Sequence, residues 1–251
     1  MRHARSFGGI VLLLVVAGAG LARAEEVKGR WGAGGFIGYN HPMFTLADRF
    51  SSKVNKYGIN ISYVPSAKAT IEVEYHRAKF DNGALVTKPF FWAPTKLNYV
   101  SANGAYDMKF SSLVMNGLVF LRKNRTMTQH SFAPYIAVGA GFYGYNATSK
   151  NILWPGQSLT DAVNAGGGKD AKGNQIPAYV MTPATDKQNA LSATLGFGME
   201  SFITNSVAMD FRARYNFIIG ELRPFDDWKL DKVFPIQLFD LSVGLKFYFW
   251  Q

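Results

Sequence analysis

The sequence predicts an all-β fold, an eight-stranded antiparallel up-and-down transmembrane β-barrel with long extracellular loops. Eight stretches alternate apolar and polar residues with the period of two that is typical of β-strands. The gaps between these stretches differ in length, and most are either very short or long. No later segment reaches the roughly 18 apolar residues that a membrane helix needs. If the chain spans a membrane, it must do so with strands, which satisfy their backbone groups in lipid only as a closed barrel.

Residues 1–24 are expected to be a secretory signal peptide, and residues 25–251 the barrel. Arg2 and Arg5 form a basic start, Ile10–Val16 a short apolar core, and a small-x-small triplet precedes the expected cleavage point. A retained anchor is the alternative, but the apolar run is too short to cross a bilayer as a helix. Removing the three arginines of this segment lowers the formal net charge from +10 to +7.

The first four strands are expected at residues 30–40, 56–64, 68–77 and 110–121. Each has about the ten residues that a tilted strand needs to cross a bilayer. Their apolar faces are Trp31, Ala33, Ile37 and Tyr39; Tyr57, Ile59, Ile61 and Tyr63; Ala69, Ile71, Val73 and Tyr75; and Leu113, Met115, Val119 and Leu121. The opposite faces carry mainly glycine and polar residues.

The last four strands are expected at residues 132–143, 191–202, 207–216 and 239–249. Their apolar faces are Ile136, Val138, Ala140 and Phe142; Leu191, Ala193, Leu195, Phe197 and Met199; Val207, Met209, Phe211, Ala213 and Tyr215; and Phe239, Leu241, Val243, Leu245, Phe247 and Phe249. Glycine recurs on the opposite face, which suits a narrow interior.

The connections predict which side of the membrane each end of the barrel faces. A Pro65-Ser66 turn, residues 203–206 and residues 122–131 are the shorter connections. The longer gaps are residues 40–55, 78–107, 145–188 and 218–237. Transmembrane barrels have short periplasmic turns and longer outer loops, so both termini are expected in the periplasm, as an even strand number requires.

Aromatic residues near the ends of the apolar faces are expected to form the girdles of such a barrel. They are Tyr57, Tyr63, Tyr75, Phe120, Phe202, Tyr215, Phe217 and Phe249. A soluble β-sandwich or lipocalin-like barrel also alternates, but it rarely has so many glycines on its polar face or a loop as long as residues 145–188.

The pattern resembles the small eight-stranded outer-membrane barrels of Gram-negative bacteria, the OmpA, OmpX and OmpW type. The most similar pieces are Pro134–Gly141, Leu195–Glu200 and the last strand. The resemblance implies that Phe247, Phe249 and Trp250 form a C-terminal signal for the barrel-assembly machinery, although here the chain does not end on Phe. The group contains anchors, adhesion proteins, conduits and a few lipid-modifying enzymes, so the resemblance identifies architecture better than function.

Charged residues on the polar faces predict an ion-paired lumen. Strand direction places Glu200, Asp210 and Lys246 nearest the periplasm, Glu72 and Arg212 midway, and Glu74, His76, Arg214 and Asp240 nearest the outside. Charges inside a narrow barrel are costly unless they are paired. The favoured interpretation is a plugged barrel with a structural or surface-interaction role. The alternatives are a gate or ligand site at Arg212, Arg214, Glu72 and Glu74, and a conduit for small or apolar solutes.

The sequence gives no catalytic, cofactor or metal site that we retain as a prediction. Gly139–Gly144 matches G-x-G-x-x-G, but no helical period follows it, so the spacing is that of one face of a strand. Three widely separated histidines outside the signal peptide lack metal-ligand spacing. A lipid A-modifying site at His76 with Ser62 or Glu74 is the remaining enzymatic alternative.

The expected location is the bacterial outer membrane, and the expected neighbours are outer-membrane lipid and lipopolysaccharide. A basic exported chain without cysteine fits such anionic surfaces and is not expected to meet nucleic acid. Aromatic residues and lysines share the long gaps, which suits contact with lipopolysaccharide, an extracellular ligand or a host surface. The alternative is that the loops pack on one another and cap the barrel. The aromatic residues are Phe90, Phe91, Trp92, Tyr99, Trp154, Tyr179, Phe225 and Trp228.

Overall fold

The computed structural model describes residues 26–81, 90–92, 96–99, 105–122, 125–150, 183–223 and 233–249. The expected signal peptide, Trp250 and most of the predicted long loops lie outside the described residues. The loop aromatics Trp154, Tyr179, Phe225 and Trp228 lie outside them as well.

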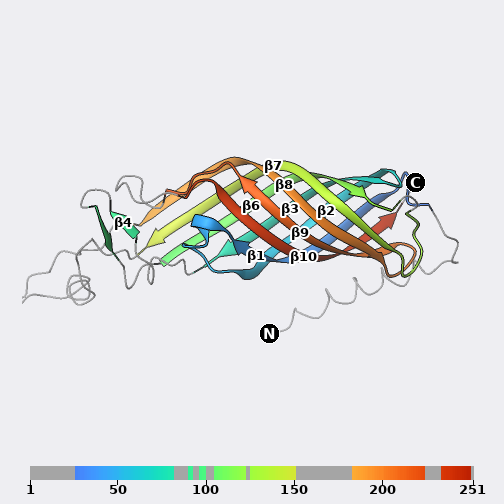
Figure 1. Ribbon diagram of the computed structural model, residues 1–251, viewed down its shortest axis with the longest axis horizontal. Coiled ribbons are helices and arrows are strands. Elements are labelled where there is room, and N and C mark those ends of the chain that lie inside the picture. Colours follow the sequence, from blue (N-terminus) through green and yellow to red (C-terminus); the bar gives the residue numbers. More distant parts are fainter. Residues whose placement is uncertain are drawn as a thin grey trace, which may run out of the picture.

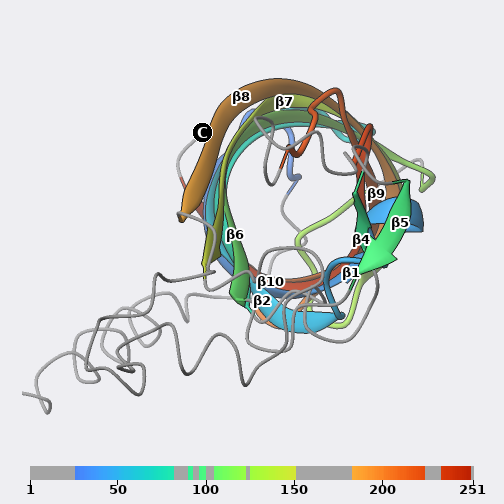
Figure 2. The same cartoon turned by 90° about the vertical axis from the view of Figure 1, so that its left-hand side faces the viewer.

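Eight strands form a closed barrel, and every neighbouring pair is antiparallel. The strands are β1 (Trp31–Pro42), β2 (Lys53–Ser66), β3 (Ala69–Phe80), β6 (Ala105–Phe120), β7 (Phe132–Lys150), β8 (Ala184–Phe202), β9 (Val207–Ile218) and β10 (Ile236–Phe249). Each pairs with the next in the chain, and β10 closes the barrel on β1, with Trp31 opposite Phe249 and Pro42 opposite Leu238. Figure 1 shows the barrel from the side, and Figure 2 shows the ring of strands from one end. The predicted eight-stranded up-and-down barrel is confirmed.

The two ends of the barrel differ. At one end, which we call the turn end, β2 and β3 are joined by Ala67 and Lys68, β8 and β9 by residues 203–206, and β6 and β7 by residues 121–131. The last strand, β10, ends at this end of the barrel (Figure 1). At the other, the loop end, the paired strands β4 (Phe90–Trp92) and β5 (Leu97–Tyr99) lie beyond the barrel.

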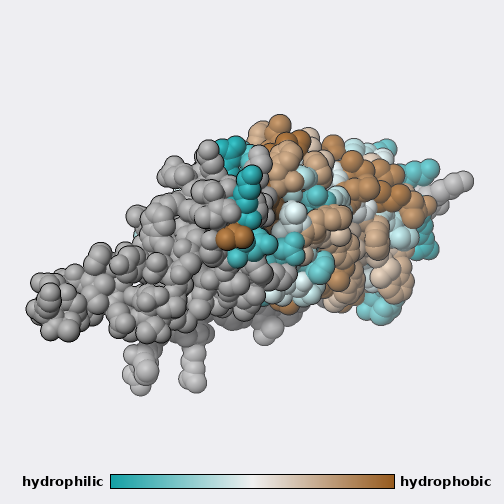
Figure 3. Space-filling view, turned by 60° about the vertical axis from the view of Figure 1, so that its left-hand side comes forward, coloured by the Kyte–Doolittle hydropathy of each residue, from teal (hydrophilic) through white to brown (hydrophobic). Residues whose placement is uncertain are grey.

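The exterior of the barrel is apolar because outward positions take the apolar half of each alternation. Ile59 is 62% exposed and Phe197 68%, whereas Glu72 and Glu74, on inward positions of β3, are fully buried. On the face shown in Figure 3, hydrophobic residues cover much of the barrel wall and hydrophilic residues lie toward its ends. We call this outward apolar surface the belt. The burial pattern is inverted relative to a soluble protein, in which charges face outward.

The belt has nearly the height of the apolar band of transmembrane barrels. On β10 its outward residues run from Leu241 to Phe249. Eight residue steps at about 3.3 Å give roughly 27 Å along the strand, or about 20 Å along the barrel axis for a tilt near 40°. That is close to the roughly 25 Å apolar band of transmembrane barrels.

Three sequence predictions need correction. The tight turn lies at Ala67 and Lys68 instead of Pro65-Ser66, because the β2–β3 register shifts between Tyr63 and Ser66 and Pro65, which has no N–H group, falls in this irregularity. Phe120 and Phe202 are buried on inward positions and take no part in an aromatic girdle. Each lies an even number of residues from an inward residue of its own strand, Asn116 or Glu200, and therefore shares its face.

The third correction concerns strand length. β7 and β8 have 19 residues each and continue well beyond the predicted strand ends, with Tyr145 opposite Gln188 and Ser149 opposite Ala184. The predicted long gap at residues 145–188 therefore begins and ends as strand. Among the described residues, the single helix is the 3-10 turn Phe44–Leu46, and none is a long apolar helix able to cross a membrane.

Candidate functional site

The inward faces of five strands and one turn bring ten charged side chains together inside the barrel. We call them the ion-pair network, and they are Lys56, Glu72, Glu74, Arg125, Glu200, Asp210, Arg212, Arg214, Asp240 and Lys246. All ten are buried. Eight of them belong to the set predicted from the sequence, and the predicted His76 lies beside them. Lys56 and Arg125 were not predicted.

Arg212 of β9 forms the middle of the network. Its Nη2 lies 2.6 Å from Glu72 Oε2 and 2.5 Å from Asp210 Oδ2, and its Nε donates to Asp210 Oδ2 at 2.6 Å. Lys246 Nζ lies 2.9 Å from Glu72 Oε2 and 3.1 Å from Asp210 Oδ2. Tyr135 donates its hydroxyl to Asp210 Oδ1 at 2.5 Å. Charge-assisted bonds from two cations thus bridge strands on opposite sides of the barrel.

A second group lies toward the loop end and is centred on Arg214. Its Nη1 donates to Glu74 Oε2 at 2.6 Å, and its Nε lies 3.3 Å from Asp240 Oδ1. Lys56 Nζ donates to Asp240 Oδ2 at 3.0 Å, and His76 Nδ1 lies 2.7 Å from Glu74 Oε1. The two groups are joined because Arg212 Nη1 also reaches Glu74 Oε2 at 3.3 Å.

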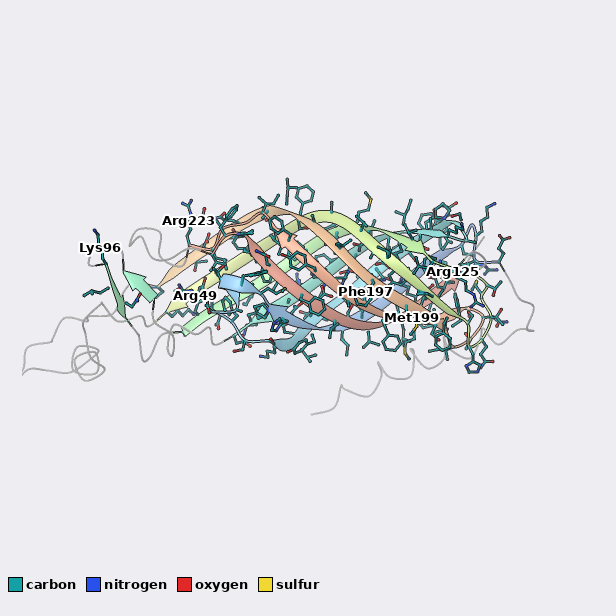
Figure 4. All side chains as sticks on the ribbon, viewed as in Figure 1. Arg49, Lys96, Arg125, Phe197, Met199 and Arg223 are labelled. Carbon is teal, nitrogen blue, oxygen red and sulfur yellow. The ribbon has the colours of Figure 1, made fainter. Side chains whose placement is uncertain are left out.

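Arg125 closes the network at the turn end, where Figure 4 labels it. It comes from the connection between β6 and β7 and enters the barrel, where its Nη2 binds Glu200 and the hydroxyl of Tyr248 at 2.7 Å, and its Nη1 donates to Thr70 at 2.9 Å. Its guanidinium lies 3.8 Å from the ring centroid of Phe120. Burial disfavours its charge, but Glu200 more than offsets this and raises the pKa of Arg125 above the ordinary value.

The charges of the network balance. Lys56, Arg125, Arg212, Arg214 and Lys246 provide five cations, and five carboxylates face them. Because unpaired buried charges cost several kcal/mol each, a neutral and fully paired set is the arrangement that a closed lumen tolerates. At the height of Arg212, the lumen therefore contains charged side chains that are paired with one another.

Aromatic and aliphatic side chains fill the barrel on the loop side of the network. Phe50 stacks on Tyr106 at a centroid distance of 4.9 Å, and Phe80 meets Phe110 edge to face at 6.1 Å. Tyr143 contacts both Phe110 and His76 and so joins this apolar layer to the charges below it. This layer was not predicted from the sequence. It places a second packed barrier in series with the ion pairs.

The class of barrel follows from three observations: the closed antiparallel barrel, the apolar belt and the neutral, buried ion-pair network. The chain is a small eight-stranded β-barrel with the outward apolar surface of a transmembrane barrel. No protein-family model matches the sequence, and the curated proteins give no significant match.

Several solved barrels resemble this one in fold. Neisserial surface protein A has a TM-score of 0.47 and 16% identity, with 87% of this chain and 97% of that chain covered. The attachment invasion locus protein Ail of Yersinia pestis has a TM-score of 0.43 and 11% identity, with 88% and 99% covered. OprG of Pseudomonas aeruginosa has a TM-score of 0.42 and 11% identity, with 90% and 99% covered.

The residues considered for enzymatic chemistry belong to the barrel strands. His76 is buried, pairs with Glu74, and lies opposite Gly58, whereas Ser62 is four residues further along β2. That offset is about 13 Å along the strand, so His76 and Ser62 are not brought together. Gly139–Gly144 lies within β7, and the chain continues as strand from there to Lys150. Among the described residues there is no group of three His, Asp or Glu side chains that could hold a metal.

The predicted assembly signal is described in part. Phe247 and Phe249 lie on outward positions of β10, opposite Ala33 and Trp31 of β1. They therefore lie at the seam where the last strand closes the barrel on the first. The role of this segment in assembly stays a prediction.

Proposed function

We propose that this protein is an integral outer-membrane barrel with a closed, non-conducting lumen, which anchors its loop end at the bacterial surface. The observation that carries the proposal is the balanced set of five cations and five carboxylates, all buried, below a packed aromatic layer. An aqueous pore would leave such groups hydrated and exposed. The belt supports the membrane location, because its outward residues suit hydrocarbon and not water.

The orientation follows from the connections. Short turns face the periplasm in transmembrane barrels, so the turn end is assigned to the periplasm and the loop end to the outside. Export by the predicted signal peptide and closure by the barrel-assembly machinery through Phe247, Phe249 and Trp250 belong to the same proposal.

Planar-bilayer recording of the refolded protein tests the closed lumen. We expect no discrete openings under conditions in which a general porin, inserted in the same bilayer, conducts. We also expect no discrete openings from Arg212→Ala, because the aromatic layer remains in place above the altered ion pairs. Wild-type openings whose conductance changes in Arg212→Ala would contradict the proposal and favour the conduit.

The proposal includes no catalytic role. Burial of His76 and Glu74 inside the barrel supports this, since a lipid outside the belt cannot reach them. Mass spectrometry of lipid A from cells that express the gene should show no new modification. A modification that appears with the wild type and disappears with His76→Ala would establish an enzyme instead.

A further inference from the structure

A basic groove lies on the outer wall of the barrel, on the loop side of the belt. We call it the rim groove. It has a volume of about 520 Å³ and is lined by residues of β2, β3, β6, β7 and β8. Its lining contains four cations, Arg77, Lys79, Lys109 and Lys187, and no carboxylate. It is separate from the ion-pair network because these side chains occupy outward strand positions.

Three of the lysines lie at one level across neighbouring strands. Lys79 of β3 pairs in register with Lys109 of β6, Lys109 with Asn146 of β7, and Asn146 with Lys187 of β8. With about 4.8 Å between strands, the row is roughly 14 Å wide. Like charges directly opposite one another on a sheet are destabilising, so the Lys79–Lys109 pair calls for an anion.

The protein itself supplies little of that negative charge. Lys79 pairs with Asp81, but Lys53 Nζ also contacts Asp81, at 2.9 Å, so one carboxylate serves two lysines. Asp107 lies two residues from Lys109 on the same outward face of β6. Lys109 and Lys187 form no ion pair within the described part of the chain. The groove therefore keeps a net positive charge.

The position of the groove limits what can fill it. The next outward row toward the turn end contains Arg77 and Ser111, and the row after that contains Leu113, Phe142 and Leu191, which belong to the belt. Two such rows correspond to about 13 Å along the strands. The lysine row thus lies just above the hydrocarbon edge, at the depth of lipid headgroups.

We propose that the rim groove binds the phosphate-bearing headgroup of an outer-leaflet glycolipid, with the acyl chains of that lipid lying on the belt below. This inference rests on the proposed function, because it needs the loop end to face the outer leaflet. Lysines are effective point charges for phosphate, and a row 14 Å wide suits a headgroup with more than one phosphate better than a single anion. A zwitterionic headgroup carries its own cation and would therefore gain less binding energy from the lysine row.

Lipid binding to the refolded protein in neutral zwitterionic bicelles tests the proposal. Lipid A with two phosphates, dephosphorylated lipid A and free pyrophosphate would be titrated separately. We expect tight binding of the phosphorylated lipid only. In the double variant Lys109→Gln/Lys187→Gln, the affinity should fall about 30-fold, since each lysine near an anionic lipid contributes roughly five-fold.

Lys68→Gln is the matched control, because it removes one exposed charge from the turn between β2 and β3, at the opposite end of the barrel. It should bind the phosphorylated lipid like the wild type. Without lipid, Lys109→Gln should unfold no more easily than the wild type, because it relieves the Lys79–Lys109 repulsion.

Three results would overturn the proposal. Equal lipid affinity in the double variant and in Lys68→Gln would show that the groove is not the site. Equal binding of dephosphorylated lipid A would assign the affinity to the acyl chains. Pyrophosphate binding as tight as that of the lipid would identify a free anion as the ligand. None of these results depends on channel conductance, so failure here is distinguishable from failure of the closed-lumen proposal.

Discussion

Arg125 is the single side chain that most directly links a turn to the interior of the barrel. Replacing it by Met keeps much of its length but leaves Glu200 with Lys246, at 3.8 Å, as its remaining cation. Breaking a buried ion pair by removing one partner costs about 3–5 kcal/mol. We therefore expect Arg125→Met to lower the free energy of unfolding by about that amount, measured by denaturant unfolding of the refolded protein.

Arg122→Met serves as the control for Arg125→Met. Arg122 lies in the same connection but is exposed, and it donates one hydrogen bond, to the carbonyl of Phe132 at 3.2 Å. Its loss should change the free energy of unfolding by less than about 1 kcal/mol. Adding Glu200→Gln to Arg125→Met should recover part of the loss, because no carboxylate is then left unpaired. Equal destabilisation by the two arginine variants would show that the burial of Arg125 does not matter.

The composition of the network was only partly predictable from the sequence. The predicted network had five acids but only Arg212, Arg214 and Lys246 as cations, which leaves two negative charges too many, although Lys56 has the inward parity of its predicted strand. The structure supplies the missing cations as Lys56, at the start of the predicted second strand, and Arg125, from a turn. Periodicity carries no information about a turn residue that folds back into the barrel. The charge imbalance itself was the signal that two cations were missing.

At the level of the strands, the close approach of β6 to β7 depends on Gly141. A Cβ at this position would lie 2.3 Å from the carbonyl oxygen of Leu113 and 2.7 Å from Cα of Val114. Both are backbone atoms and cannot move aside independently. Gly141→Ala should therefore lower the free energy of unfolding by about 1–3 kcal/mol, as overpacking does elsewhere.

Gly117→Ala on the neighbouring strand is the comparison for Gly141→Ala. A Cβ there would meet nothing closer than the carbonyl oxygen of Val138 at 3.8 Å, and the position faces outward. The free energy of unfolding should stay constant or rise slightly, because alanine reduces the entropy of the unfolded chain. If both glycine variants unfolded alike, inward packing between β6 and β7 would not be limiting.

The strands were predictable where lipid is expected to contact them and less so beyond that region. Inside the belt, one face is apolar and the other polar, so alternation marks each strand clearly. Beyond it, β7 continues with Tyr145, Ala147 and Ser149 inward, but its outward residues become Asn146 and Thr148. Both faces can then be polar, and the apolar half of the pattern ends although the backbone ladder continues.

For the molecule as a whole, the fold depends on two different environments. The belt faces hydrocarbon, and the neutral ion-pair network occupies the lumen. Soluble barrels and transmembrane barrels share the alternation, and what separates them is which face meets the surroundings. The exposure pattern is that of a transmembrane barrel, because Ile59 and Phe197 are exposed whereas Arg212 and Glu72 are buried. The sequence favoured this inversion, because a soluble barrel rarely has so many glycines on its polar face or a gap as long as residues 145–188.

A charge placed on the middle of the belt tests this view of the whole molecule. Leu195 lies at the centre of the outward row of β8, between Leu191 and Met199, and Leu195→Arg should cost about 2–4 kcal/mol of unfolding free energy in lipid vesicles. Thr185→Arg, outward on the same strand but beyond the belt, should cost less than about 1 kcal/mol, because a charge near the interface stays hydrated. Equal costs for the two variants would mean that hydrocarbon does not surround β8. A larger cost for Leu195→Arg in lipid than in detergent micelles, where water reaches the arginine more easily, would show that the bilayer itself imposes the penalty.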